Sequence, residues 1–106
     1  MIAEIRLQSN NVESTATFWS AIFDVPAVQL ADGRWRVAPA EGPAVVVRTA
    51  TVAETISRYC DMTVRADGAA ADRLRAAAFE VSLPGWPLSA VDINGTDATV
   101  FLVVKS

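Results

Sequence analysis

The sequence predicts an α+β fold made of two tandem βαβββ modules, packed as a single domain of 106 residues. The first observation is an internal repeat: segment 11–23 is echoed by segment 67–79, and each copy joins a short polar residue to an apolar helical stripe. The second is that residues with alternating polarity precede each copy, at 4–8 and 61–65. Either copy alone has too little core to be stable, so we expect the two to pack about a pseudo-twofold axis. The pairs that carry the repeat are Asn11 and Asp67, Phe18 and Leu74, and Phe23 and Phe79.

The first module begins with a predicted strand and a predicted helix. Residues 3–9 alternate with the period of two that a half-buried strand requires. Asn11 can cap the helix that follows, because its side chain can accept a hydrogen bond from an unpaired amide group of the first turn. Apolar residues then recur on one helix face as far as Phe23, and Pro26 prevents the helix from continuing.

Three short strands are predicted to complete the first module, which covers residues 1–50. Asp32 and Gly33 form a hairpin turn between the first two of these strands. A second turn at 41–43 leads into the third, because its sequence Glu-Gly-Pro is typical of turns. The expected strands are 27–30, 35–38 and 44–49.

A linker helix over residues 51–58 is predicted to join the two modules, because Thr51 and Glu54 have the spacing of a capping box. The second module then covers residues 59–106 and repeats the order of the first. Its expected elements are strand 61–65, helix 69–78, strand 79–83, a rigid loop at 84–87 and a final hairpin turned by Asn94 and Gly95.

Charge and hydropathy exclude two classes of partner. A net charge of −3 gives no electrostatic footprint for nucleic acid. Hydrophobic residues make up 52% of the chain, yet the apolar run 100–104 is far shorter than the roughly 20 residues that span a bilayer. The first residues lack the pattern of a signal peptide, and the single cysteine, Cys60, has no internal disulfide partner. We therefore expect a cytoplasmic protein with no membrane partner.

The chain resembles the vicinal oxygen chelate superfamily, which includes glyoxalase I, extradiol dioxygenases, fosfomycin resistance enzymes and bleomycin resistance proteins. The resemblance lies in the opening segment from Glu4 to Trp19, in segment 64–82 (VRADGAAADRLRAAAFEVS) and in the closing hairpin 91–104 (VDINGTDATVFLVV). It implies that the strands form a cup-shaped, curved mixed sheet whose inner face holds a ligand or a metal.

The resemblance also implies where a catalytic metal would bind. In the enzymes of the superfamily, the metal ligands lie at the start of each module's first strand and in each module's last strand. Here those positions fall on Glu4, on Asp61 or Cys60, and in segments 45–47 and 99–101. The chain has no histidine, whereas a bound transition metal favours imidazole or thiolate ligands. We therefore expect no metal and no other cofactor.

Acid–base catalysis depends on two carboxylates. Glu4 and Asp61 can act as a proton donor and acceptor if both face the cup. The favoured alternative is that Arg6 and Arg65 neutralise them as ion pairs along the strands. We therefore assign no catalytic residue, and a metal-dependent lyase, isomerase or dioxygenase that uses these carboxylates stays open as the alternative function.

The sequence feature that indicates a function is the number of tryptophans: the chain contains three. Trp19 lies on the apolar stripe of the first predicted helix and is expected in the core. Trp35 is flanked by two arginines, and Trp86 is held between two prolines that restrict its backbone. Each of these two residues can serve either as a stacking surface for a ligand or as a packing or dimer contact. The two roles are compatible, and the sequence does not choose between them.

These observations favour a non-catalytic binding protein over an enzyme. The chain most resembles the bleomycin resistance branch, whose members sequester a drug by stacking its planar groups between aromatic side chains in crevices shared by two subunits. We therefore predict a homodimer that sequesters a planar aromatic natural product or a peptide antibiotic. A third hypothesis is a small dimeric regulatory or scaffold domain whose cup is filled by its own side chains. The predicted ligand-binding residues are Trp35, Trp86, Arg36, Arg6, Glu4, Asp61 and Phe101.

Overall fold

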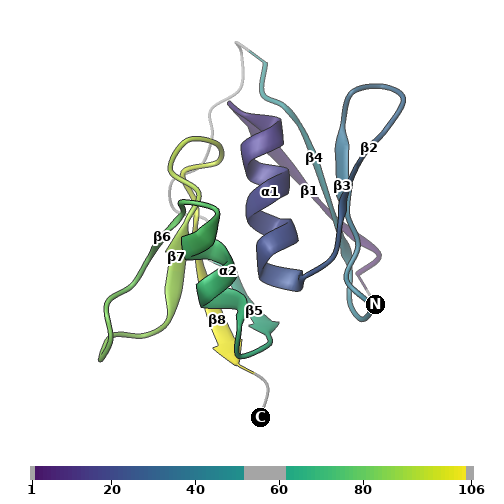
Figure 1. The fold of residues 1–106 in the computed structure, drawn as a ribbon. Helices are drawn as coiled ribbons and strands as arrows, with labels where there is room; N and C mark the ends of the chain where they lie inside the picture. The colour runs from purple at the N-terminus through teal and green to yellow at the C-terminus, as the bar shows by residue number, and fades with distance from the viewer. Residues whose placement is uncertain (1, 52–61, 105–106) are drawn as a thin grey trace.

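The computed structural model describes residues 2–51 and 62–104, which form two βαβββ modules in succession (Figure 1). The α+β class and the tandem order of elements are therefore confirmed. The first module contains β1 (Glu4–Ser9), α1 (Val12–Phe23), β2 (Ala27–Gln29), β3 (Trp35–Val37) and β4 (Ala44–Thr49). The second contains β5 (Met62–Ala66), α2 (Ala70–Ala76), β6 (Glu80–Val81), β7 (Ser89–Val91) and β8 (Thr99–Val104). Most of the predicted linker helix, residues 52–58, lies outside the described residues.

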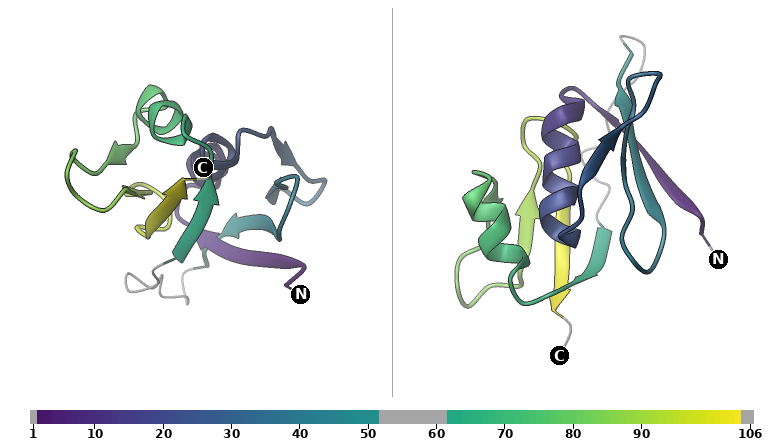
Figure 2. Two further views of the ribbon diagram at one scale, coloured as in Figure 1. Left: turned by 90° about the horizontal axis from the view of Figure 1, so that it is seen from below. Right: turned by 45° about the vertical axis from the view of Figure 1, so that its right-hand side comes forward.

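Each module forms a four-stranded mixed sheet in which the first strand is parallel to the last. The strand order is β1-β4-β3-β2 in the first sheet and β5-β8-β7-β6 in the second. Figure 2 shows that the two sheets follow one another in a curve, with both helices on the same side. The edge strands β1 and β5 therefore lie where the modules meet.

Helix α1 begins with the Asn11 cap that the sequence predicts. The Asn11 side chain accepts a hydrogen bond from the Ser14 amide at 3.1 Å, which satisfies one of the unpaired amides of the first turn. The helix ends at Asp24, whose left-handed backbone (φ 55°) lets its own amide donate to the Ser20 carbonyl. Between these ends, α1 buries one face against the core. The buried residues are Thr15, Ala16, Phe18, Trp19 and Ile22.

Helix α2 is shorter than the predicted span 69–78. It ends at Ala76 because Ala78 adopts a left-handed backbone with φ of 66°, which no continuing helix tolerates. Its start also differs from that of α1, since no side chain caps it. Asp67, the counterpart of Asn11 in the repeat, accepts the Ala69 amide at 2.9 Å in the turn before the helix instead. Neither α1 nor α2 is long and apolar enough to cross a membrane.

The strand predicted at 79–83 is reduced to the two residues of β6. Pairing nevertheless extends to Ser82, whose amide donates to the Ser89 carbonyl at 2.9 Å. The loop over residues 83–88 then leaves the sheet, because proline at 84 and 87 has no amide proton with which to continue the ladder.

A single hydrophobic core runs through both modules. Phe18 of α1 and Phe79 of the second module meet edge to face, with ring centroids 5.0 Å apart. The fully buried members of the core come from both helices and both sheets. They are Phe18, Trp19, Ile22, Val37, Val45, Val47, Ala66, Ala70, Leu74, Ala90, Val100 and Leu102.

A buried polar joint connects the modules at the start of α1. The carboxylate of Asp92, which is fully buried, accepts a hydrogen bond from the Thr15 hydroxyl at 2.5 Å. It also accepts the amide and the hydroxyl of Thr96, each at 3.0 Å. The Ser9 and Thr15 hydroxyls are hydrogen-bonded to each other at 2.7 Å. The turn between β7 and β8 is thus docked on the junction between β1 and α1.

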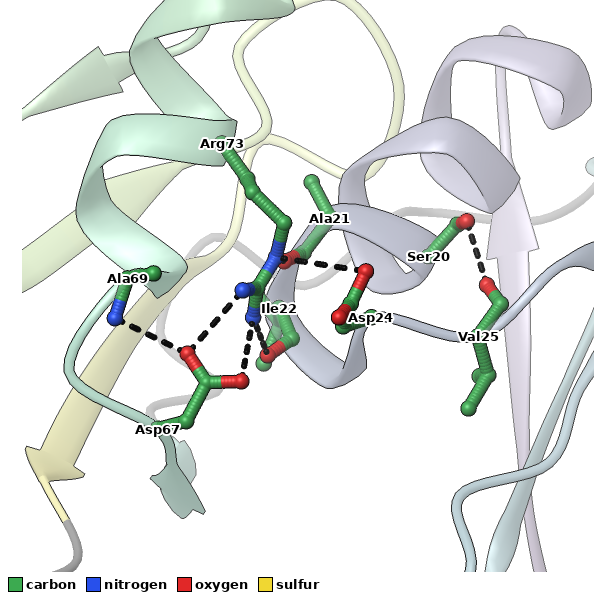
Figure 3. Close-up of polar contacts among 8 residues, drawn as sticks. All are labelled: Ser20, Ala21, Ile22, Asp24, Val25, Asp67, Ala69 and Arg73. Atoms are coloured by element: carbon green, nitrogen blue, oxygen red, sulfur yellow. Dashed lines mark hydrogen bonds and ion pairs between the residues drawn. The ribbon is translucent and has the colours of Figure 1, made fainter.

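A second joint lies at the opposite end of α1 (Figure 3). The guanidinium of Arg73, on α2, donates to the carbonyls of Ala21 and Ile22 at 2.7 Å and 3.2 Å. It also pairs with the Asp67 carboxylate at 3.0 Å. Arg73, followed by the Ala69 amide, holds the pKa of Asp67 below its ordinary value. Arg73 therefore supplies donors to a helix end that has no basic residue of its own.

Candidate functional site

The register of the strands decides which face of the first sheet each candidate residue occupies. Val45 and Val47 of β4 belong to the core that α1 covers. Trp35 is paired with Val47, so its side chain lies on this same helix-covered face, where it is half-buried. Arg36 points to the opposite face, which we call the outer face of the sheet. Trp35 and Arg36 therefore cannot contact one ligand from the same side of the sheet.

Glu4 and Arg6 also lie on the outer face of the first sheet. The Arg6 Nε atom donates to Glu4 Oε1 at 2.7 Å, so the ion pair that the sequence favoured for Glu4 is present. Because the Arg6 side chain is largely exposed, the pair contributes less than about 1 kcal/mol to stability. Its role at the surface is to present one cation and one anion close together.

Gln8 continues the same outer face and was not among the residues proposed from the sequence. Its Oε1 atom is buried, and no donor among the described residues reaches it. A buried amide oxygen without a donor is costly, which marks it as a position where a ligand can donate a hydrogen bond. Gln8 follows Glu4 and Arg6 at every second position of β1, and this alternation could have placed it on the same face.

The outer face of the second sheet contains a groove that is mainly apolar. Ser89 and Phe101 are paired across β7 and β8 and form its floor, and the loop over residues 83–88 forms its wall. The groove has a volume of about 440 Å³. We call it the Trp86 groove, and its lining residues are Ser82, Leu83, Trp86, Pro87, Ser89 and Phe101.

Trp86 is the most accessible aromatic residue at this site. Both Trp86 and Leu83 are 71% exposed, which is unusual for large apolar side chains. The Trp86 amide donates to the Leu83 carbonyl at 3.2 Å, and Gly85 between them takes a positive φ of 91°. This turn and the adjoining Pro87 restrict the backbone and present the indole to solvent.

The structure thus brings some of the predicted site residues together and separates others. Trp86 and Phe101 share the Trp86 groove, whereas Glu4, Arg6 and Arg36 share the outer face of the first sheet. Asp61 lies outside the described residues. Leu83, Ser82 and Ser89 complete the groove and were missed because only the loop geometry brings them beside Phe101.

The positions that the resemblance implies for a metal do not fit a transition-metal site. Among the described residues, the outer faces place Glu4, Val46, Thr99 and Phe101 at these positions. Glu4 is already paired with Arg6, and Thr99 offers only a neutral hydroxyl. Valine and phenylalanine have no ligand atom. Within residues 2–51 and 62–104 no three His, Cys, Asp or Glu side chains gather closely enough to hold a metal ion.

Comparison with solved structures assigns the fold. The fosfomycin resistance protein FosX from Mesorhizobium loti aligns with a TM-score of 0.72 at 14% identity, over 100% of this chain and 92% of that chain. FosX from Listeria monocytogenes, complexed with Mn(II) and sulfate, aligns with a TM-score of 0.68 at 13% identity, over 100% and 90%. A glyoxylase/bleomycin resistance protein/dioxygenase domain from a Frankia species aligns with a TM-score of 0.69 at 13% identity, over 100% and 98%.

No family model and no curated protein sequence matches the chain. At identities of 13–14% the structural likeness establishes the fold and leaves the activity to be argued from this chain's own residues. The resemblance predicted from the sequence is confirmed at that level: the chain has the fold of the vicinal oxygen chelate proteins, built from two βαβββ modules.

Proposed function

We propose that the protein is a non-catalytic binding protein that sequesters a planar aromatic molecule, with the Trp86 groove as its principal contact. The observation that supports this most is the exposure of Trp86 and Leu83 on a restricted loop above Phe101. Exposed apolar surface of this kind is typical of binding sites. An indole held in one orientation loses little conformational freedom when a flat ring stacks on it.

The chemistry of the groove favours binding over catalysis. Its lining carries hydroxyl groups and apolar side chains, and none of the six lining residues is charged. General acid–base catalysis needs a titratable group within hydrogen-bond reach of the substrate, and this groove supplies none among the described residues. Stacking with a few hydroxyl contacts suits the flat heteroaromatic groups of a peptide antibiotic, so we assign the protein to antibiotic sequestration and resistance.

We further propose that the protein acts as a homodimer with two equivalent composite sites. The helices cover one face of each sheet, so the outer faces are left for a partner. A second copy can place the outer face of its first sheet, with Glu4, Arg6 and Arg36, opposite the Trp86 groove. Twofold symmetry then makes this crevice occur twice. In this arrangement Arg36, and not Trp35, faces the ligand.

Replacing Trp86 by alanine is expected to weaken the binding of planar aromatic compounds by about 1–3 kcal/mol, the range typical of aromatic anchors. The affinity can be measured by calorimetry with bleomycin and with a panel of flat heteroaromatic natural products. Trp35→Ala is the matched control, because Trp35 lies on the helix-covered face. The proposal fails if Trp86→Ala leaves every affinity unchanged, or if the purified protein holds one equivalent of transition metal.

Sedimentation at micromolar concentration is expected to give about twice the chain mass of 11.3 kDa, with ligand binding saturating near two molecules per dimer. The physical reason is that a dimer covers the apolar outer face around Phe101 and Val103, the latter 50% exposed in the single chain. A monomer that binds its ligand at full affinity would contradict the composite site and leave the Trp86 groove as the whole site.

A further inference from the structure

A second pocket lies where the two modules meet, away from the Trp86 groove. It is formed by α1, by β1 and β4 of the first sheet, by the loop over residues 39–43 and by β5 of the second sheet. We call it the seam pocket. Its volume of about 640 Å³ exceeds that of the Trp86 groove and lies within the range of small-molecule sites, about 300–1,000 Å³. It shares no lining residue with the groove.

The walls of the seam pocket are apolar and partly aromatic. Phe23 of α1 contributes a half-buried ring. Trp19, one helical turn earlier and only 1% exposed, packs against it with ring centroids 5.6 Å apart at an angle of 32°. Ile5 and Val64 come from the facing edge strands β1 and β5. Aromatic and aliphatic walls of this kind favour a ligand with a flat apolar body.

Two charged residues line the same pocket. Arg65 comes from β5 and Glu41 from the loop over residues 39–43. No hydrogen bond or ion pair joins either side chain to another described residue. Because β5 is an edge strand, a side chain pointing to either of its faces can reach a pocket beyond that edge.

Arg65 is the better placed of the two to hold a ligand. Its backbone is fixed by parallel pairing with Val103 of β8, whereas Glu41 lies in an exposed turn beside Gly42. A guanidinium also presents a planar set of donors that matches a carboxylate, and a fixed backbone reduces the entropy lost on binding. Glu41 would repel an anion, and so directs the anionic end of a ligand toward β5.

We propose that the seam pocket is a second binding site, which takes an aromatic carboxylate with its ring against the half-buried Phe23 and its anionic group on Arg65. The site goes beyond the proposed function, because the aromatic residues of the Trp86 groove take no part in it. A ligand bound there touches both modules, so its binding also stabilises their relative position.

The test uses a Trp86→Ala chain, which removes the groove's stacking surface, and two isosteric probes: 2-naphthoate and its neutral analogue 2-naphthamide. Calorimetry is expected to show 2-naphthoate binding about tenfold more tightly than the amide, a difference of about 1.4 kcal/mol. Adding Arg65→Gln should bring the two affinities together. Arg75→Gln, on the exposed surface of α2, is the matched control and should leave the difference unchanged.

Two further variants locate the site and fix the sign of the ligand charge. Val64→Phe puts a ring into the pocket and should block both probes, with circular dichroism confirming the fold. Glu41→Gln should leave 2-naphthoate binding equal or stronger. The proposal is overturned if neither probe binds, if Arg65→Gln acts no more strongly than Arg75→Gln, or if Glu41→Gln weakens 2-naphthoate.

Discussion

Replacing Gly95 by alanine is expected to lower the free energy of unfolding by roughly 3 kcal/mol, a large loss for a change of one methyl group. A Cβ atom at this position would overlap the Thr15 hydroxyl and lie 2.6 Å from Asp92 Oδ2 and 2.8 Å from Ser9 Oγ. Overpacking alone costs about 1–3 kcal/mol, and the turn that moves away leaves buried hydroxyl and carboxylate groups without partners.

Urea unfolding followed by circular dichroism measures this loss, and a second glycine provides the control. A Cβ atom at Gly68 would meet its nearest neighbour, Val104, at 3.9 Å, which is ordinary van der Waals contact. Gly68→Ala should therefore leave stability nearly unchanged. Combining Gly95→Ala with Thr15→Ala should cost less than the sum of the two single changes, because removing the Thr15 hydroxyl relieves one of the overlaps with the methyl group. Equal stabilities for the two glycine variants would show that the joint is not tightly packed.

Replacing Trp19 by alanine is expected to cost about 3–5 kcal/mol, the range for removing a large aromatic ring from a core. Trp19 is only 1% exposed, and its ring contacts Phe18 edge to face with centroids 5.9 Å apart. The sequence predicted this position from the apolar stripe of the helix, and the structure confirms it.

The same unfolding measurement separates the tryptophans by role. Trp86→Ala should change stability by no more than about 0.5 kcal/mol, since its side chain lies mainly in solvent. If Trp19→Ala and Trp86→Ala destabilise the protein to the same extent, the assignment of one to the core and the other to a binding surface is wrong.

Local patterns were sufficient to predict the elements whose cause is local. Asn11 defines the start of α1, Pro26 prevents the helix from continuing beyond its cap at Asp24, and alternation defines β1 with its outer residues Glu4 and Arg6. The prolines around Trp86 indicated a restricted loop but left open whether its side chain packs or faces solvent, and the structure shows it 71% exposed. Helix α2 was predicted too long because its end depends on the backbone of Ala78, and alanine carries no sequence signal for a left-handed conformation.

The features that the sequence did not reveal depend on contacts between distant residues. The face on which Trp35 lies is set by its register with Val47 on the neighbouring strand, not by the arginines beside it. Asp92 sits in a segment that resembles an ordinary exposed turn, yet it is buried by contact with Thr15, which is 77 positions away. The Trp86 groove likewise needs Phe101, which only the sheet brings close.

The two joints on α1 have a consequence for how the chain folds. The amide of Asn10 donates to the Gly95 carbonyl at one end of this helix, and Arg73 binds the carbonyls of Ala21 and Ile22 at the other. Arg73 follows Ala21 and Ile22 by 52 and 51 positions, and Gly95 lies still later in the sequence. Because these contacts join positions far apart in the sequence, we expect the first module to complete its packing only when the second module is available.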